Sequence, residues 1–305
     1  MRIGTVAEET SGDQALGNLA DQLRRAADDG FASAWMSNIF GLDALTSLAV
    51  AGSQVPGIEL GTAVVPTYPR HPAVLAQQAL TAALAVGPGR LMLGIGLSHK
   101  IVIEDMYGYS FDRPARHMRE YMSVLLPLLD GTAVSVDGST LSAHIGLSTP
   151  RAGRVPVLLA AMAPRMLDLA GEQADGTVLW MTGPATVRDY VVPAISAAAS
   201  AAGRPSPRVV CLLPVCVTSD PAAARASAEK EFAIYGQLPS YRAMLDREGA
   251  VGPGDVAIVG DEDAVAAQIL ALADAGVTDF VAGEFARAED RERTRSLLKA
   301  VISAS

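Results

Sequence analysis

Cysteine is scarce in this sequence, which has only Cys211 and Cys216 among its 305 residues. Two cysteines cannot form the framework of a disulfide-rich fold. Their odd separation inside one expected strand points their side chains to opposite faces of a sheet, so they neither pair nor share a metal ion. We expect both to be core residues.

Basic residues are also few. Lysine and arginine together number 24 against 33 aspartates and glutamates, which gives a formal net charge of −9 and a pI near 5.0. A protein that binds the phosphate backbone of nucleic acids needs a basic stripe, and no segment supplies one. Nucleic acid is therefore not an expected partner.

Long hydrophobic runs are absent. The most apolar stretches, such as 155–162, are far shorter than the ~20 residues that cross a bilayer. Residues 1–6 read as a strand and lack the charged and then apolar order of a signal peptide. We expect no membrane segment and a cytoplasmic protein.

Apolar residues nevertheless make up half of the chain, and 19% of the residues are charged. This composition provides enough apolar surface for a large core and excludes a mainly disordered chain. The length suits either one α/β barrel or two smaller domains.

Short β-branched runs alternate with long alanine-rich helical patterns. The run 155–160 is apolar on both faces, which is typical of parallel strands in a covered sheet. The repeated βα units predict a (β/α)8 TIM barrel, one domain over 1–305, with a doubly wound sheet as the alternative. The expected strands cover 2–6, 33–37, 59–65, 91–96, 156–160, 177–181, 209–217 and 278–283.

Two stretches exceed the simple repeat. Asp137-Gly138 between β-forming residues predicts an inserted hairpin at 133–145. A helical insertion is expected at 220–259, and insertions of this kind usually cover the catalytic end of a barrel. Three helices are expected to begin at a proline, preceded by Asp112, Ala163 and Asp220.

Several known functional motifs are incomplete or absent in this sequence. Gly94-Ile95-Gly96 follows a strand, but His99 stands where a dinucleotide-binding loop needs its third glycine. The glycines therefore indicate either a tight turn or a surface that a planar ring can approach. No nucleophile elbow, Walker loop or metal-ligand spacing occurs, which argues against hydrolase, NTPase and metal functions.

Histidine numbers only four. His99 follows the fourth expected strand, where barrel enzymes place catalytic side chains, and imidazole can transfer a proton near neutral pH. His71 lies at an equivalent strand end. An ordinary hydrogen-bonded histidine is the alternative for both, and we assign no role to His117 or His144.

The segment 160–165 runs from a strand directly into a helix, and the free N–H groups of a helix start suit a phosphate. An ordinary βα turn is the alternative. Trp180 lies at the carboxyl end of the sixth expected strand, where an indole either stacks on a ring or caps the barrel core.

These motifs together resemble the bacterial-luciferase-like flavin and deazaflavin oxidoreductases. The resemblance covers nearly the whole chain and is closest to members that use coenzyme F420, through residues 98–118. The runs that carry it are LGTAVVP at 60–66, RHP at 70–72, GRLMLGIG at 89–96, AAMAP at 160–164 and AGEQADG at 170–176.

The resemblance implies a TIM barrel with insertions and a small organic substrate. It implies coenzyme F420, with FMN as the alternative cofactor, and leaves the oligomeric state open, with a homodimer as one form. The cofactor-binding residues it implies are Thr62, Ala63 and Val64 against the ring, Gly96, Leu97 and Ser98 beside it, Ala161, Met162 and Ala163 at the phosphate, and Gly176, Thr177 and Trp180 in the wall.

One departure affects the substrate. Deazaflavin sugar-phosphate dehydrogenases place an Asp-His pair after the second strand, and here those positions are Asn38 and Ile39; a glutamate acid of those enzymes aligns with His99. Oxidation of a sugar phosphate is therefore not expected. We take His99 as the proton-transfer candidate and Asn38 as the group that polarises substrate or ring.

Three functions are consistent with these features of the sequence. The first is F420-dependent hydride transfer to or from an unidentified substrate. The second is an FMN-dependent monooxygenase, and the third is a cofactor-binding protein without catalysis.

Overall fold

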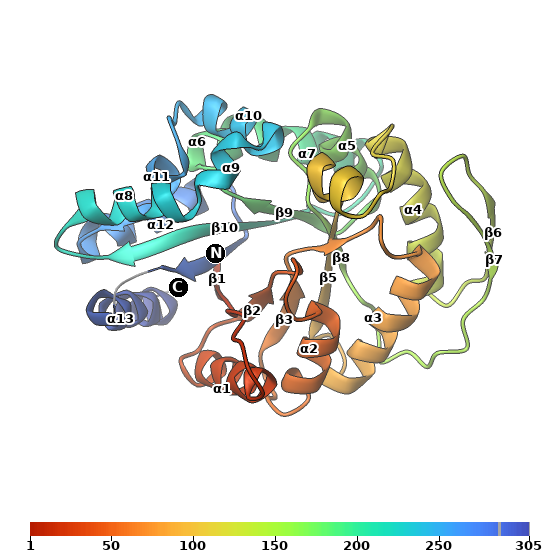
Figure 1. Cartoon of the computed structure of the whole chain (residues 1–305), viewed down its shortest axis with the longest axis horizontal. Coiled ribbons are helices and arrows are strands. Elements are labelled where there is room, and N and C mark those ends of the chain that lie inside the picture. The colour runs from red at the N-terminus through yellow and green to blue at the C-terminus, as the bar shows by residue number, and fades with distance from the viewer. Residues whose placement is uncertain (286–287, 305) are drawn as a thin grey trace.

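The computed structural model describes residues 1–285 and 288–304, and in these a ring of eight parallel strands closes into a barrel (Figure 1). The ring closes because β9 pairs with β10, and β12 joins β10 to β1. The expected TIM barrel is confirmed, and a doubly wound open sheet is excluded. The barrel strands are β1 (Arg2–Val6), β2 (Ser33–Met36), β3 (Glu59–Thr62), β5 (Leu91–Gly96), β8 (Val157–Leu159), β9 (Gly176–Trp180), β10 (Arg208–Val217) and β12 (Asp279–Glu284).

Two short strands lengthen the barrel wall. The expected strand 59–65 divides at a cis peptide bond between Ala63 and Val64, after which β4 (Val65–Pro66) pairs with the end of β5. β11 (Ile258–Gly260) pairs with the end of β10 and was not expected from the sequence.

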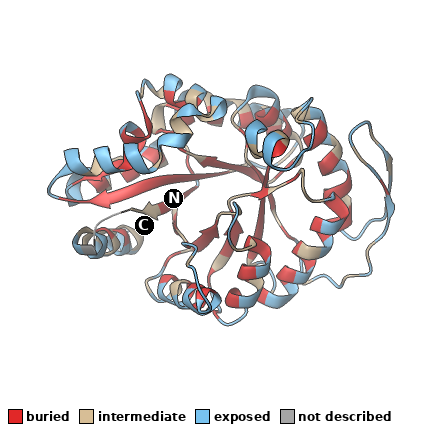
Figure 2. Ribbon diagram, in the orientation of Figure 1, coloured by how far each residue is buried: buried red, intermediate tan, exposed pale blue. Residues whose placement is uncertain are grey.

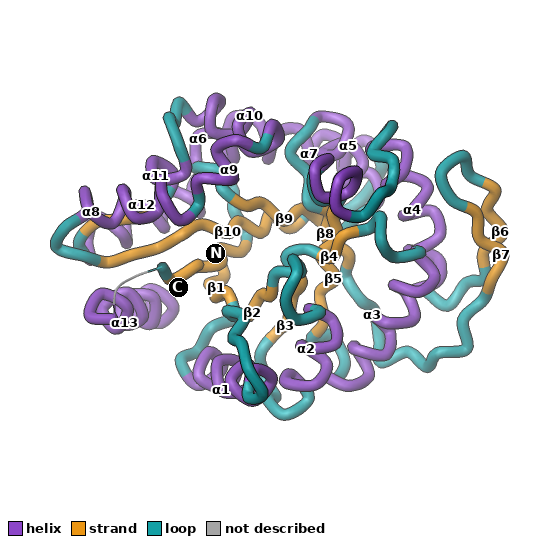
Figure 3. The backbone as a smooth tube through the Cα atoms, viewed as in Figure 1, coloured by secondary structure: helices purple, strands orange, loops and turns teal. Residues whose placement is uncertain are grey.

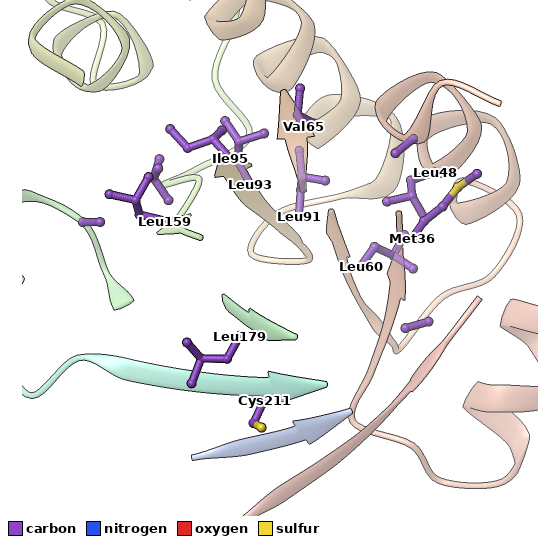
Figure 4. Packing of buried hydrophobic residues seen from close by; sticks show 14 of the residues in the cluster. Met36, Leu48, Leu60, Val65, Leu91, Leu93, Ile95, Leu159, Leu179 and Cys211 are labelled. Carbon is purple, nitrogen blue, oxygen red and sulfur yellow. The ribbon is translucent and has the colours of Figure 1, made fainter. Parts of the chain in front are cut away.

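Each barrel strand is buried on both faces, as Figure 2 shows. Trp35 is fully buried in the barrel interior with Met92, Leu158 and Val281. Gly61 faces this indole, because a Cβ there would lie 2.3 Å from the Trp35 ring. The alternate residues point outward into a second apolar layer beneath the helices, where Leu93 and Leu159 lie in Figure 4.

Helices surround the barrel. α8 (Pro221–Glu231) begins at its expected proline, and the Asp220 carboxylate accepts the Ala223 N–H. α4 also begins at its expected proline, but Arg113 with φ +52° holds the cap position in place of Asp112. The outer helices are α1 (Ala15–Asp28), α2 (Ala44–Gly52), α3 (Pro72–Val86), α4 (Pro114–Leu129), α5 (Pro164–Gln173), α6 (Pro184–Thr186), α7 (Val192–Ala201), α12 (Glu262–Asp274) and α13 (Ala288–Ala304), with π-helical turns η1 (Val102–Met106) and η2 (Val187–Val191).

Both expected insertions are present, and each interrupts the regular alternation of strand and helix. β6 (Val134–Asp137) and β7 (Ser142–Ile145) pair antiparallel and project beyond the barrel wall (Figure 3). The second insertion carries helices over the carboxyl ends of the strands. These are α8 (Pro221–Glu231), α9 (Ala233–Gln237), α10 (Pro239–Glu248) and α11 (Pro253–Val256).

Both cysteines are buried and unpaired, as expected. Burial raises the pKa of the Cys211 thiol to about 12 and that of Cys216 to about 11. Within the described residues, no helix is long and apolar enough to cross a membrane.

Candidate functional site

Two cavities open near the carboxyl ends of the barrel strands. A cavity of about 1400 Å³ lies at the ends of β5 and β8, beneath α9 and α10. A smaller one, of about 630 Å³, lies at the ends of β10 and β12, and its lining has more carboxylates, among them Glu8, Asp220 and Glu231, than arginines. Acidic walls repel a phosphate, so only the larger cavity suits an anionic cofactor.

The floor of the larger cavity is made of small and apolar residues from three strand ends. A Cβ at Gly96 would lie 2.6 Å from Val64 Cγ2 and 3.1 Å from Ala160 Cβ, so only glycine lets these strands meet. Behind it, a Cβ at Gly94 would lie 1.9 Å from the Thr62 carbonyl oxygen. The result is an apolar floor that a planar ring can lie against.

His99 stands beside this floor. Ser98, at φ +61°, turns the chain out of β5, and His99 then lines the cavity. Its ring centroid lies 5.5 Å from that of Tyr241. Burial lowers the pKa of the His99 imidazole below its usual value, so the ring is mainly neutral at pH 7. No described residue forms a hydrogen bond with its ring nitrogens.

The rim of the cavity carries more positive than negative side chains. The exposed side chains of Lys100, Arg113, Arg116 and Arg165 line it, against the carboxylates Glu104 and Asp105. Lys100 is partly neutralised because its Nζ lies 3.6 Å from a Glu104 oxygen. The rim therefore favours an anion.

The start of α5 adds uncharged donors to this rim. Ala163 holds the cap position without a side-chain bond, and Pro164 follows it. In the described part of the chain, the amide N–H groups of Met162, Ala163 and Arg165 have no acceptor. Free N–H groups at the positive end of a helix bind phosphate oxygens.

The wall behind the rim is an aromatic stack. His117 is buried and its Nε2 lies 3.1 Å from Thr67 Oγ1. Tyr68 stacks on this imidazole with ring centroids 4.0 Å apart, and on Phe111 at 5.4 Å. Burial lowers the pKa of His117 to about 4. A neutral His117 therefore packs behind Tyr68, and Tyr68 in turn packs behind Phe111, which lines the cavity.

The structure brings many of the predicted site residues together. Thr62 lies just behind the floor, where its Oγ1 donates to the Gly94 carbonyl at 2.8 Å, and Ala161 is buried beside β8. Ala63 packs against the apolar interior of the barrel. The predicted residues that line the cavity are Val64, Gly96, Leu97, Ser98, His99, Met162 and Ala163.

Four predicted residues lie outside the cavity lining. Gly176 and Thr177 start β9, and Thr177 pairs with Leu159 at the carboxyl end of β8, where its Oγ1 donates to the Leu159 carbonyl at 2.8 Å and to the Ala161 carbonyl at 3.5 Å. Trp180 ends that strand, but its ring packs edge-on against Phe232 and Tyr235 and does not line the cavity. The Asn38 side chain is also outside the lining, and its Oδ1 accepts the Ala44 N–H at 3.1 Å.

His71, the second histidine candidate, caps α3. Its Nδ1 accepts the Ala73 N–H at 3.3 Å, so Nε2 carries the proton and donates to the Ser142 carbonyl of the hairpin at 3.1 Å. Both nitrogens therefore have structural partners.

The sequence did not identify the side chains that the helical insertion adds to the cavity. Gln237, Ser240 and Tyr241 come from α9 and α10. The only sequence signal for them was the length of the insertion, which predicts a cover for the catalytic end. Among the described residues, no group of histidine, cysteine or carboxylate side chains could hold a metal ion.

Comparison with known proteins agrees with this geometry. A family model described as luciferase-like monooxygenase matches residues 1–279. The chain is similar to a 5,10-methylenetetrahydromethanopterin reductase of Methanolobus tindarius, with 27% identity over 296 residues that cover 87% of this chain and 89% of the relative.

Two solved structures share the fold. One is an F420-dependent secondary alcohol dehydrogenase in complex with an F420-acetone adduct, with a TM-score of 0.82 at 20% identity over 99% of this chain and 98% of that one. The other is the oxygenating constituent of 3,6-diketocamphane monooxygenase of Pseudomonas putida with FMN, with a TM-score of 0.77 at 18% identity over 99% and 96%.

Proposed function

The chain belongs to the luciferase-like monooxygenase family of flavin- and F420-dependent oxidoreductases, and from this premise we propose that it uses coenzyme F420 to transfer a hydride to or from a small organic substrate. The observation that carries the proposal is the larger cavity, which combines an apolar floor with an anion-binding rim. A cofactor with a planar ring and an anionic side chain needs both.

The floor and the rim of the cavity would bind different parts of the cofactor. Val64, Gly96 and Ala160 would support the ring, and the free N–H groups at the start of α5, with the Arg165 side chain, would hold the phosphate. The other exposed rim cations, Lys100, Arg113 and Arg116, favour a cofactor with more negative charge than one phosphate, as F420 has in its glutamate tail.

The protein's own contribution is proton transfer, orientation and exclusion of water. When bound, the deazaflavin accepts or supplies the hydride. The neutral His99 imidazole can take a proton from the substrate and return it in the reverse direction. The Phe111 wall and the helices α9 and α10 cover the reacting region.

The relatives support F420 without excluding FMN. The secondary alcohol dehydrogenase is F420-dependent and is matched over 98% of its length, and the camphane monooxygenase, matched over 96% of its length, shows that the same fold also binds FMN. An FMN-dependent monooxygenase is therefore the competing outcome of the test.

Equilibrium binding tests the proposal. The purified chain is titrated with F420 and with FMN at one ionic strength, and binding is followed by quenching of cofactor fluorescence. We expect F420 to bind at least tenfold more tightly. Equal or reversed affinities would refute the assignment of F420, tighter binding of FMN would favour the monooxygenase, and absence of binding by both would reject a cofactor site.

A further inference from the structure

Tyr241 brings a second titratable group into the larger cavity. It lies in α10, within the helical insertion, and lines the same cavity as His99. In the described part of the chain, its hydroxyl forms no hydrogen bond. Two ring side chains from distant parts of the sequence thus lie 5.5 Å apart between centroids, each with polar atoms left without a protein partner.

The two groups have complementary hydrogen-bonding states. Burial raises the pKa of the Tyr241 phenol, so it stays protonated at neutral pH and can donate. Burial lowers the pKa of His99, so its neutral ring offers one nitrogen that accepts. Together they can hold one oxygen atom, as a carbonyl by donation from tyrosine and as a hydroxyl by donation to histidine.

Among the described residues that line this cavity, no cation is buried. Met162, Ile234 and Leu238 are apolar and Gln237 and Ser240 are neutral, whereas the positive side chains lie exposed at the rim. A carboxylate or phosphate beside the pair would lose its hydration without gaining a buried cation. The pair therefore suits a neutral oxygen.

We propose that Tyr241 and His99 bind the reacting oxygen of the substrate between them, and that the substrate is a neutral ketone or aldehyde or the corresponding alcohol. The redox step rests on the proposed function. In the oxidation, His99 takes the alcohol O–H proton and Tyr241 donates to the carbonyl oxygen that forms, and a deazaflavin, when bound, would accept the C–H hydrogen with its electron pair. Reduction reverses each transfer.

Tyr235 provides a matched control. Its ring packs edge-on against Tyr241, with centroids 5.1 Å apart, and against Trp180 at 5.8 Å, but it does not line the cavity. Burial also raises the pKa of its phenol. Tyr235→Phe and Tyr241→Phe therefore each remove one hydroxyl from the same aromatic cluster, and only the second changes a residue that lines the cavity.

The contact can be tested on the cofactor-free protein. The seven tyrosines are labelled with ¹³C at Cζ, and the signals of Tyr235 and Tyr241 are assigned from their loss in the two Phe variants. Cyclohexanone and acetophenone serve as probes. We expect both probes to shift the Tyr241 signal and leave that of Tyr235 in place. No shift of the Tyr241 signal with either probe, or equal shifts of both signals, would overturn the proposal.

Affinity gives an independent readout. Tyr241→Phe should weaken cyclohexanone binding by roughly fivefold, as expected for one lost hydrogen bond, while Tyr235→Phe stays within about twofold. Both variants should keep the parent's F420 affinity. Unchanged ketone affinity in Tyr241→Phe would refute this contact, whereas failure of F420 to bind any of the three proteins would refute the proposed function and leave the contact standing.

Discussion

Protonation of His117 should destabilise the protein in mild acid. This imidazole is buried between Tyr68 and Tyr121, with Thr67 as its hydrogen-bond partner. Burial holds its folded-state pKa at about 4, well below the usual 6.5, although the nearby Glu120 carboxylate opposes the shift. The unfolded chain therefore binds this proton first as the pH falls.

The size of the effect follows from the two pKa values. A group that titrates near 6.5 when unfolded and near 4 when folded loses about 3 kcal/mol of folding free energy between pH 7 and pH 4. The loss begins below pH 6.5 and stops growing below pH 4, where both states are protonated. Between pH 7 and pH 4.5 it amounts to about 2 kcal/mol.

Urea unfolding of the parent and of His117→Gln across this pH range isolates the effect, because carboxylates titrate alike in both proteins. We expect the parent to be the more stable at pH 7 and its advantage to shrink by about 2 kcal/mol at pH 4.5. His144→Gln is the matched control, since His144 lies exposed on the hairpin.

Two results would refute this reasoning. One is a stability difference between parent and His117→Gln that stays constant from pH 7 to pH 4.5. The other is an NMR titration of the folded protein in which the His117 ring protonates near pH 6.5, which would mean that water or a conformational change solvates the ring.

Three further predictions concern the site and the thiols. Ala163→Asp places a carboxylate at the start of α5 and should weaken F420 binding about tenfold through like-charge repulsion. Ala222→Asp, in the exposed first turn of α8, should leave F420 affinity unchanged. Equal F420 affinities in the two variants would show that the phosphate does not bind at the start of α5. His99→Gln should lower single-turnover hydride transfer by about 100- to 10,000-fold with F420 affinity retained, and a rate within about threefold of the parent would remove His99 from the mechanism. Because burial raises the pKa of Cys211 and Cys216, neither should react with a thiol reagent at pH 8 until the protein unfolds, and rapid labelling of the native protein would contradict their burial.

The barrel was predictable because each buried parallel strand corresponds to a short apolar run in the sequence. The runs 2–6 and 91–96 match β1 and β5 residue for residue, since each is a short, mainly apolar run that leads into a loop. β11 was missed because three residues are too few to give a period. The division of 59–65 at Ala63 depends on a backbone turn that leaves no pattern in side-chain polarity.

The site was only partly predictable because it depends on contacts between distant segments. His99 was found since it follows a barrel strand, and parallel strands all end at the same face. Tyr241 could not be found, because α10 is a short helix far along the chain that reaches the cavity only through packing. The same holds for His117, whose partner Thr67 is 50 residues away.

The wall residues depend on packing that the sequence does not show. The resemblance implied Gly176, Thr177 and Trp180 in one wall. In the structure, the Thr177 Oγ1 donates to the Leu159 carbonyl at the end of β8, whereas the Trp180 ring packs edge-on against Phe232 and Tyr235 of the helical insertion. The positions of these insertion rings relative to β9 follow from tertiary packing and not from the order of residues along the strand.

The position of bound F420 tests the central claim most directly. A crystal structure of the chain grown with saturating F420 should show the ring against Val64, Gly96 and Ala160, and the phosphate within hydrogen-bonding distance of the Arg165 amide N–H. Electron density for the cofactor in the acidic cavity between β10 and β12, or a larger cavity left without F420 at saturating concentration, would contradict the assignment.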